Sequence, residues 1–423
     1  MQKKAAKYST LAQRINWLED VARKLVEQKE SVALTLTHET AKPIAFARIE
    51  VERCIETIRI TAATMMTMAG ETINTDAMPS GKKTEAYFKR EPAGVIVAIT
   101  PFNFPLNLVA HKLAPALVAG NSVVLKPTPE APMTAFRFAQ LFIESEYAVH
   151  DALSVIYGDA EVGSTLVESD IPRVISFTGS VPVGRIITRS AGIKKIGLEL
   201  GGNAATFIEK SADLSYAANR CAFGAFANSG QVCISLQRIY VQSDIYEEFA
   251  TLIAQETAKL KVGSCYDEET FMSALINEEA ATRAKGWIDS AVVSGARLIS
   301  GGEQSKNVIT PAVLADVTDD MSIVCEEVFA PIVSLVKVES FDEALLKMND
   351  SPYGLQFSLF SDSVRLAKRA IDEYEAGGVV INDVPTVRFD IAPYGGVKLS
   401  GVGREGAKFA IEEMTEIKSV VIA

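Results

Sequence analysis

Residues 94–126 read GVIVAITPFNFPLNLVAHKLAPALVAGNSVVLK, and this stretch decides the fold class. Its first part, 94–99, is a continuous apolar run, which is typical of a strand buried on both faces of a sheet. A helix is expected over about 105–119, and a second apolar strand is expected over 122–126. Strand, helix and strand in this order make one βαβ unit, which implies a parallel sheet with a right-handed crossover.

The same alternation continues toward the C-terminus. Helices are expected at 133–146, 160–168 and 181–191, and strands at 153–157, 173–177 and 195–199. A second alternating half is expected to contain elements at 204–208, 212–228, 238–241, 245–260, 278–294, 312–314, 332–336, 341–349, 363–374 and 378–381. We therefore expect an α/β protein with two doubly wound parallel-sheet domains, whose ligands bind at the carboxyl ends of the strands. Helices at about 10–68 precede them.

The composition excludes several classes of protein. The chain has 423 residues, and its 42 Lys and Arg against 53 Asp and Glu give a net charge of −11, so a nucleic-acid surface is not expected. Three histidines, and five cysteines without a Cys-x-x-Cys pair, argue against a metal site, an iron–sulfur cluster and a disulfide framework. No apolar run is long enough to predict a membrane span. These observations favour a cytoplasmic protein with reduced thiols.

Cys233 is the best candidate for a nucleophile. It lies in the segment NSGQVCI (228–234), among small and polar neighbours, and a reactive thiol needs such a setting. The other thiols lie in apolar or acidic surroundings, which favour a buried or weakly reactive side chain: Cys54, Cys221, Cys265 and Cys325.

Two further polar side chains stand out against apolar surroundings. Glu199 ends a buried strand, where burial would raise the pKa of its carboxyl group toward that of a general base. The alternative is an ion pair with Lys194 or Lys195. Asn103 lies between prolines and aromatic residues, where its amide could stabilise an oxyanion, or it could simply cap the helix over 105–119.

Two features could bind a nucleotide. The segment FTGSVPVG (177–184) runs from a strand end into a helix, and glycines at a helix N-terminus favour a phosphate. Lys126 ends a strand at a position from which it could reach a ribose or a phosphate. A plain tight turn and a solvated strand end would show the same patterns.

Taken together, these motifs resemble the NAD(P)-dependent aldehyde dehydrogenase superfamily over essentially the whole chain. The resemblance rests on PFNFP at 101–105, FTGS at 177–180, LELGG at 198–202, GQVCI at 230–234, EEVF at 326–329 and PYGGVKLSG at 393–401. The interval of 34 residues from Glu199 to Cys233 (233 − 199) also fits. Within the superfamily, the segments 100–111, 233–241 and 382–388 are most similar to the lactaldehyde dehydrogenase-like group.

The resemblance implies a mechanism and a cofactor, NAD or NADP, without a metal ion. Cys233 would attack the aldehyde, Asn103 and the Cys233 backbone N–H would hold the oxyanion, and Glu199 would activate water to hydrolyse the thioester. Lys126 is expected on the adenosine ribose and Glu327 on the nicotinamide ribose. The whole expected cofactor set is Ile99, Thr100, Pro101, Phe102, Lys126, Thr128, Glu130, Gly158, Gly163, Phe177, Thr178, Gly179, Ser180, Gly184, Leu200, Gly201, Glu327 and Phe329.

The expected substrate is a small hydroxy- or acidic aldehyde, similar to lactaldehyde. The residues expected to line an apolar tunnel for it are Phe104, Phe389 and Tyr394. Asn107 and Arg388 could meet a hydroxyl or an anionic group. The alternative for Arg388 is a surface ion pair with Asp390 or Asp383.

The sequence departs from the family pattern in four places. Pro129 replaces a ribose-binding glutamate, with Glu130 one residue later, which would relieve repulsion of a 2′-phosphate and admit NADP. Ala330 replaces a glycine and residues 263–275 lack a Gly-Pro pair, which predicts local differences only. The chain also starts late relative to the family, so we expect part of the N-terminal layer to be missing, at a cost in stability, oligomer packing or cofactor retention.

The resemblance also implies a domain organisation and an oligomer. The expected parts are an NAD(P)-binding domain (1–79 and 92–198), a catalytic domain (199–407) and an oligomerisation element (80–91 and 408–423). The segments 80–91 and 415–423 predict strands with no partner in either domain, and an exposed apolar edge strand normally finds one. A homodimer or homotetramer is therefore expected.

Two other functions stay open. The thioester could pass to coenzyme A instead of water, although a positioned base such as Glu199 favours hydrolysis. The chain could also be a folded but inactive subunit that serves as an assembly partner, because a fold alone does not establish activity.

Overall fold

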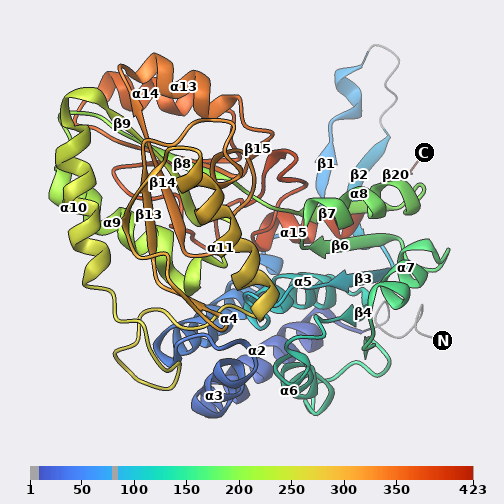
Figure 1. Ribbon diagram of the computed structural model, residues 1–423. Coiled ribbons are helices and arrows are strands. Elements are labelled where there is room, and N and C mark those ends of the chain that lie inside the picture. The colour runs from blue at the N-terminus through green and yellow to red at the C-terminus, as the bar shows by residue number, and fades with distance from the viewer. Residues whose placement is uncertain (1–8, 79–83, 423) are drawn as a thin grey trace.

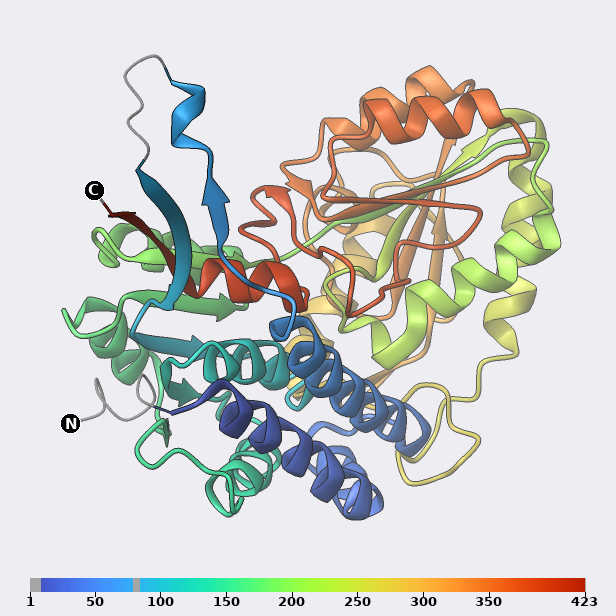
Figure 2. The same ribbon diagram turned by 180° about the vertical axis from the view of Figure 1, so that it is seen from behind.

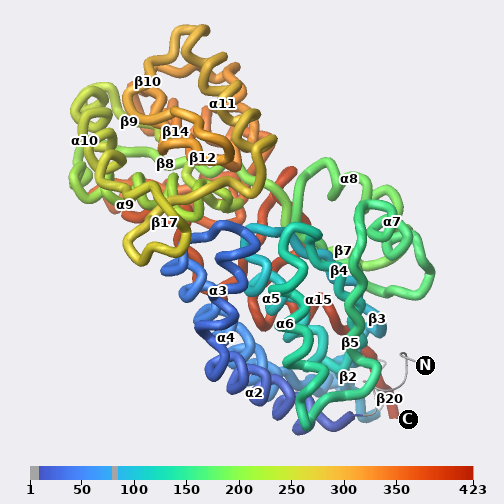
Figure 3. Tube along the Cα trace, turned by 60° about the horizontal axis from the view of Figure 1, so that its bottom comes forward, coloured from blue at the N-terminus to red at the C-terminus, as the bar shows by residue number. Residues whose placement is uncertain are grey.

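Two sheets lie at the centre of the molecule, and helices cover both faces of each (Figures 1 and 2). The computed structural model describes residues 9–78 and 84–422. Figure 3 shows the two sheets in separate halves that lie side by side. The predicted α/β class with largely parallel sheets is confirmed. The domain boundaries stay predictions, and the parts of them at 1–8, 79–83 and 423 lie outside the described residues.

The first sheet has the strand order β19-β7-β6-β3-β4-β5. Its strands are β3 (Val95–Ile99), β4 (Ser122–Lys126), β5 (Leu153–Val155), β6 (Val174–Thr178), β7 (Lys195–Glu199) and β19 (Gly401–Val402). Strand β3 pairs in parallel with both β4 and β6, so the strand order reverses beside it. Open α/β sheets bind ligands at such a switch point, outside the carboxyl ends of the strands.

The second sheet has the strand order β10-β13-β14-β9-β8-β16-β17. Its strands are β8 (Ala204–Ile208), β9 (Leu236–Gln242), β10 (Arg297–Ser300), β13 (Ala312–Ala315), β14 (Ile332–Val338), β16 (Gln356–Phe360) and β17 (Gly378–Ile381). All its pairs are parallel except that of β10 with β13. Strands β8 and β16 are buried along their whole length, and their polar side chains Ser358 and Thr206 satisfy each other, because Ser358 Oγ donates to Thr206 Oγ1 at 2.7 Å.

Most helices agree with the predicted ranges to within a few residues. The helices are α2 (Leu11–Glu27), α3 (Lys29–Thr40), α4 (Ile44–Met65), α5 (Asn107–Val118), α6 (Pro132–Ile143), α7 (Ala160–Glu168), α8 (Val181–Ser190), α9 (Leu214–Phe226), α10 (Tyr246–Ala258), α11 (Glu278–Val293), α12 (Ser322–Cys325), α13 (Phe341–Asn349), α14 (Val364–Glu373) and α15 (Ala407–Glu413), with short 3₁₀ turns η2 (Thr75–Ala77), η3 (Ala227–Gly230) and η4 (Ser243–Ile245). None of the helices in the described ranges combines the length and the apolar character that a membrane span requires.

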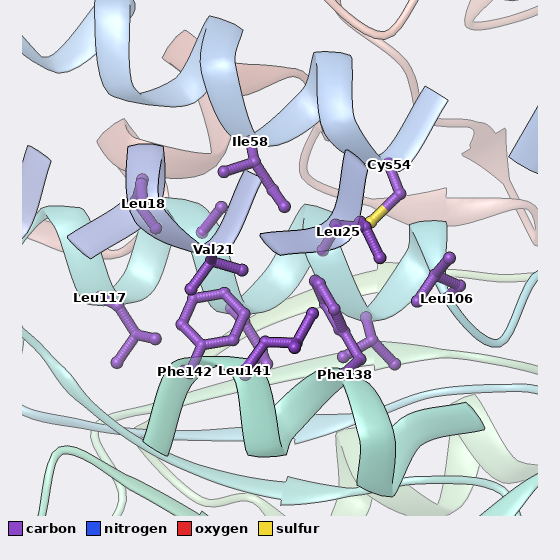
Figure 4. Close-up of a cluster of buried hydrophobic side chains, with 14 of the residues drawn as sticks. Leu18, Val21, Leu25, Cys54, Ile58, Leu106, Leu117, Phe138, Leu141 and Phe142 are labelled. Carbon is purple, nitrogen blue, oxygen red and sulfur yellow. The ribbon is translucent and has the colours of Figure 1, made fainter. Parts of the chain in front are cut away.

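The N-terminal helices form one layer with α5 and α6 over the first sheet. Their apolar side chains meet in a buried cluster, which contains Leu18, Val21, Leu25, Cys54, Ile58, Leu106, Leu117, Phe138, Leu141 and Phe142 (Figure 4). The indole Nε1 of Trp17 donates to the carbonyl of Phe142 across 2.8 Å and ties α2 to α6. Cys54 and Cys221 are fully buried, as the sequence predicts for structural thiols.

A third, three-stranded sheet stands away from the body of the first half (Figure 1). It contains β1 (Glu71–Ile73), β2 (Glu85–Pro92) and β20 (Thr415–Ile422) in the order β1-β2-β20. The two segments predicted to lack a partner pair with each other, because β2 and β20 form an antiparallel ladder from Glu85 to Pro92. Strand β20 is left at an edge, largely exposed. The remaining strands form two antiparallel pairs, β11 (Gln304–Ser305) with β12 (Val308–Ile309) and β15 (Tyr353–Gly354) with β18 (Val397–Lys398).

Candidate active site

Cys233 lies in a tight loop between α9 and β9. The loop opens with three successive left-handed residues, 228–230, whose φ angles are 52°, 57° and 69°. A Cβ at Gly230 would lie 2.2 Å from a backbone carbonyl oxygen, so only glycine fits there. The helix predicted over 212–228 therefore ends at Phe226.

Asn103 ties this loop to the first half of the molecule. Its Nδ2 donates to the carbonyl of Gln231 across 3.1 Å. Its own backbone carbonyl accepts from Asn228 Nδ2 at 3.3 Å and from Lys42 Nζ at 2.7 Å. The backbone carbonyl of Cys233 is itself so close to Gly202 that a Cβ there would lie 2.3 Å away. Cys233 thus lies where the two halves meet.

The N-terminus of α5 is capped by Glu50, not by Asn103. Glu50 Oε1 accepts hydrogen bonds from the backbone N–H groups of Leu106 at 2.9 Å and Asn107 at 3.1 Å. Glu50 also forms a fully buried ion pair with Lys42. The alternative reading of Asn103 as a helix cap is therefore wrong.

The Cys233 thiol is within hydrogen-bonding distance of a tyrosine. Tyr394 Oη lies 2.9 Å from Cys233 Sγ. Burial raises the pKa of Cys233 to about 11, although the contact with Tyr394 and the charge of Arg388 act in the opposite direction. Deprotonating this thiol therefore needs stabilisation from its neighbours.

Glu199 is buried at the end of β7, with 6% of its surface exposed. Its Oε2 finds no hydrogen-bond partner among the described residues. Burial, reinforced by the charge of Glu405, raises the pKa of Glu199 well above its ordinary value. The alternative ion pair is not formed, because Lys194 Nζ donates to the carbonyl of Ala191 and Lys195 Nζ lies 3.0 Å from Glu416.

A buried charge network lies beside Glu199, and the sequence prediction missed most of it. Lys112 Nζ is 3.3 Å from Glu405 Oε1, and Arg388 Nη2 is 2.9 Å from Glu405 Oε2. Burial alone would raise the pKa of Glu405, but Lys112, His111 and Arg388 outweigh it and lower that pKa. The sequence could have indicated Lys112, because it lies in an otherwise apolar helix, and a lysine buried there normally has a charged partner.

The switch point of the first sheet offers unsatisfied polar groups. Thr100 follows β3 and Thr178 ends β6, and the two strands are neighbours. The Oγ1 atoms of both threonines are buried without a hydrogen-bond partner among the described residues. A buried hydroxyl group without a partner can form a hydrogen bond to a polar ligand.

Three of the predicted glycines cannot carry a side chain, because protein atoms already lie too close to the position of a Cβ. A Cβ at Gly179 would lie 2.5 Å from the Phe177 ring, and one at Gly184 would lie 2.7 Å from Leu200. A Cβ at Gly201 would lie 2.2 Å from Glu327 Oε2. Packing therefore requires glycine at these three positions, and the bare backbone beside the N-terminus of α8 fits the phosphates of NAD(P).

The side chain of Glu327 is held close to these glycines. Its Oε1 accepts the backbone N–H of Gly202 at 3.0 Å. Burial raises the pKa of Glu327 to about 7, although this hydrogen bond and Arg283 lower it. Phe329 packs edge to face on Phe102, with ring centroids 6.0 Å apart.

The predicted ribose end lies around Lys126, at the carboxyl end of β4. Lys126 is largely buried, and a Cβ at Gly163 would lie 3.7 Å from its Cε. Thr128 Oγ1 donates to the exposed Glu130. The other predicted cofactor residues, Ile99, Pro101, Gly158 and Ser180, lie at or just beyond strand ends of the same sheet.

A cavity of about 170 Å³ opens onto Cys233. Four residues predicted to meet the substrate line it: Phe104, Asn107, Arg388 and Tyr394. Phe389 does not, because 69% of its surface is exposed and it lies outside this lining, so the prediction for Phe389 is wrong. The lining also contains two cations that the sequence prediction missed, Lys42 and Arg53.

Arg388 is paired, but in the interior. Its Nε lies 3.3 Å from Asp390 Oδ1, and Arg53 Nη2 lies 2.8 Å from the same oxygen. Asp383 pairs instead with Arg220. The predicted alternative of an Asp390 pair is therefore correct, although the pair is buried and not at the surface.

The sequence model of the aldehyde dehydrogenase family matches residues 1–420. The chain belongs to this family. It is therefore an NAD(P)-dependent oxidoreductase that acts on aldehydes, of class EC 1.2.1.-.

Curated relatives and solved structures agree with this assignment. The 3-sulfolactaldehyde dehydrogenase of Priestia aryabhattai is 43% identical over 94% of this chain and 83% of its own length. The lactaldehyde dehydrogenase of Methanococcus aeolicus is 40% identical over 97% of this chain and 87% of its own. Among solved structures, aldehyde dehydrogenase 21 of Physcomitrella patens, in complex with the reaction product succinate, has a TM-score of 0.96 at 36% identity, covering 99% of this chain and 88% of that one. The glyceraldehyde-3-phosphate dehydrogenase GapN of Methanocaldococcus jannaschii, complexed with NADP, has a TM-score of 0.95 at 37% identity, covering 99% and 91%.

Proposed function

We propose that this enzyme oxidises a small hydroxy- or acidic aldehyde, similar to lactaldehyde, to the carboxylic acid. The observation that carries the proposal is the cavity in front of Cys233, whose apolar walls also hold the charged groups of Lys42, Arg53 and Arg388. Each of these cations is paired within the protein, Lys42 with Glu50 and both arginines with Asp390. An ammonium or guanidinium group carries further N–H donors that can meet a hydroxyl or an anionic group of the substrate, which a long apolar aldehyde lacks.

The first chemical step belongs to Cys233. Once the thiol has lost its proton to solvent, the thiolate forms a bond to the aldehyde carbon, and the carbonyl π electrons move to oxygen. The amide nitrogen of Asn103 carries two hydrogens, of which the Gln231 carbonyl engages one, so the second can hold the oxyanion with the Cys233 backbone N–H. When bound, the nicotinamide supplies the hydride acceptor that turns the resulting thiohemiacetal into a thioester.

Glu199 releases the product. Burial raises the pKa of Glu199, which makes its carboxylate form a stronger base toward water than that of an ordinary glutamate. The hydroxide oxygen then bonds to the thioester carbon, the carbon–sulfur bond breaks, and Cys233 leaves as a thiolate. The Lys112–Glu405 pair lies against Glu199 and fixes the electrostatic environment in which that proton is held.

The polar end of the substrate would meet the outer part of the cavity. Arg53 is the most exposed cation of the lining, with 28% of its side chain accessible. The names of the relatives support this class of substrate, since a sulfonate and a hydroxyl distinguish 3-sulfolactaldehyde and lactaldehyde from simple alkyl aldehydes.

NADP is proposed as an accepted cofactor beside NAD. Pro129 stands where the family pattern has a carboxylate, and Glu130 is exposed and hydrogen-bonded to Thr128. A 2′-phosphate next to Lys126 would therefore meet a cation and a carboxylate that is already engaged.

A panel of aldehydes tests the proposal directly. Lactaldehyde, 3-sulfolactaldehyde, succinic semialdehyde and hexanal are each supplied with NAD+ or NADP+, and absorbance of the reduced cofactor is followed. We expect at least one of the three polar aldehydes to exceed hexanal in kcat/KM by about tenfold or more, and Cys233→Ala to abolish turnover. A preference for hexanal, or normal turnover by Cys233→Ala, would overturn the substrate class or the role of the thiol, respectively.

The rival functions give different outcomes in the same assay. A coenzyme A acyltransferase would yield an acyl-coenzyme A product when coenzyme A is added, and an inactive assembly subunit would bind cofactor without oxidising any aldehyde.

A homo-oligomer built through β20, and a cytoplasmic setting for the five free thiols, are part of the same proposal.

A further inference from the structure

Tyr394 is the only tyrosine of the described residues whose hydroxyl contacts a cysteine sulfur. Tyr394 Oη lies 2.9 Å from Cys233 Sγ, and only 6% of the tyrosine is exposed. Its backbone is fixed on both sides, because its N–H donates to the Glu405 carbonyl at 3.0 Å and its carbonyl accepts the Glu405 N–H at 2.6 Å. The hydroxyl is therefore held in place before any substrate arrives.

Arg388 lies over the face of the same tyrosine. Its Cζ is 3.7 Å from the ring centroid, and Glu405 and Asp390 hold the guanidinium there. A cation against the ring favours negative charge on the phenolic oxygen and on the sulfur next to it. The hydroxyl of Tyr394 is thereby a stronger hydrogen-bond donor than that of an isolated tyrosine.

We propose that Tyr394 donates its phenolic hydrogen to the Cys233 thiolate and so increases the fraction of enzyme that carries the reactive nucleophile. The direction of the bond follows from the chemistry, since a thiolate has no hydrogen to give and can only accept. Burial keeps the tyrosine protonated, because it raises the pKa of Tyr394 well above its ordinary value. The inference rests on the proposed role of Cys233 and adds a specific partner to it.

The proposed stabilisation of the thiolate depends on the hydroxyl group of Tyr394 and not on its ring. Phenylalanine at this position would fill the same wall of the cavity and keep the Arg388 contact, but it would leave the thiolate without its donor. The other charged groups around Cys233 are the same in both proteins, so a change in the titration of the thiol reports the missing hydroxyl. These groups are Arg388, Glu199, Glu327, Lys42, Glu50 and Arg53.

Alkylation of Cys233 measures the thiolate without requiring turnover. The protein without added cofactor is treated with iodoacetamide between pH 6 and pH 11 (roughly the range over which thiols titrate), and the rate at Cys233 is read from its peptide by mass spectrometry. We expect Tyr394→Phe to move the midpoint upward by about one to two pH units, the effect of losing one hydrogen bond to a charged group. Because burial raises the pKa of the parent's thiol to about 11, the two rates should draw together only above pH 11, and below it the variant should react about tenfold to a hundredfold more slowly at each pH.

Tyr374→Phe is the matched control. Tyr374 is also buried in the second half of the molecule, but its hydroxyl faces the carbonyl of Ser358 at 3.4 Å, so its removal should leave the midpoint unchanged. A second readout is kcat/KM for the best aldehyde, which should fall in Tyr394→Phe by the same factor as the alkylation rate at the same pH. A purely structural role would change the two rates by unrelated factors.

An alkylation rate in Tyr394→Phe that equals or exceeds the parent's below pH 11 would overturn the proposal, as would a loss of kcat/KM without a matching loss of alkylation rate. Failure of the proposed function is visible separately, because alkylation proceeds whether or not any aldehyde is oxidised. A shifted midpoint in a protein that oxidises no aldehyde would support the tyrosine contact and refute the proposed substrate chemistry.

Discussion

At the scale of single residues, the site requires glycine at positions where a side chain would displace a neighbouring group. Gly201 shows this best, because a methyl group there would lie 2.2 Å from the carboxylate of Glu327. Glu327 in turn accepts the N–H of the next residue, Gly202. The carboxylate that we expect on the nicotinamide ribose is thus positioned by a backbone without a side chain.

Gly201→Ala should therefore push Glu327 out of place. We expect KM for NADP+ or NAD+ to rise by about tenfold to a hundredfold, the cost of a lost hydrogen bond to a charged group. Steady-state kinetics with varied cofactor measure this. Gly286→Ala is the control, since nothing lies within 4 Å of a Cβ at that helical position and its kinetics should match the parent's. Unchanged KM in Gly201→Ala would argue that Glu327 does not touch the cofactor.

The residues that carry chemistry differ in how far the sequence could predict them. Cys233 and Glu199 were predictable because a polar group among small residues, or at the end of an apolar strand, is anomalous in a local window. Lys42, between α3 and α4, and Arg53, on α4, were not, because cations in a loop or on an amphipathic helix normally face solvent. Only the packing of this part of the chain beside the Cys233 loop gives them an inner position.

At the scale of elements, the helices and long strands follow from periodicity, and the short strands do not. The apolar spacing in α2 and the continuous run of β3 are properties of single segments. Strand β19 has two residues and exists only because Gly401 and Val402 pair with the end of β7. Its partner is some two hundred residues away, so no local pattern could reveal it.

The contact between α2 and the chain beyond α6 makes a prediction for stability. Asp20 accepts from Ser145 Oγ at 2.6 Å and pairs with Arg23 and Lys24 at 2.5 Å and 3.0 Å. Burial alone would raise the pKa of Asp20, but these three partners outweigh it and hold the pKa at about 2. Asp20→Asn should cost about 1–3 kcal/mol at neutral pH and lower the melting temperature.

The pH dependence of that loss has a defined sign. Because the pKa of Asp20 is lower in the folded protein, its stabilising effect is complete above the unfolded value of about 4 and is lost as the pH falls toward 2. The difference in melting temperature between Asp20→Asn and the parent should therefore narrow from pH 5 to pH 3. Glu19→Gln, at an exposed neighbouring position, should show no such change. A difference that stays constant would contradict the assigned pKa.

At the scale of the whole molecule, the site exists only where the two halves meet. Lys42, Asn103 and Cys233 are far apart in the chain, yet they are joined through the carbonyl of Asn103 and the loop before the thiol. The sequence could predict two α/β halves, and the family resemblance could predict which residues matter. The buried network around Glu405 required the assembled fold, because its members come from α5, from the loop before β18 and from the segment before α15.

The edge strand β20 makes a prediction for assembly. Ile417 and Val421 lie on one face of it, with 60% and 65% of their surfaces exposed. If that face meets a second copy, the double variant Ile417→Lys with Val421→Lys should lower the molar mass in light scattering to that of one chain. An unchanged oligomer, or a parent protein that is already a monomer, would refute an interface at this strand.

The central claim is that one thiol carries the acyl group and one carboxylate releases it, and rapid mixing of Glu199→Gln with aldehyde and NADP+ or NAD+ tests it most directly. We predict a single burst of reduced cofactor, about one per Cys233, and an acyl adduct on that cysteine in the intact-mass spectrum, followed by little turnover. Steady-state turnover equal to the parent's, or a burst that leaves no adduct on Cys233, would contradict the account.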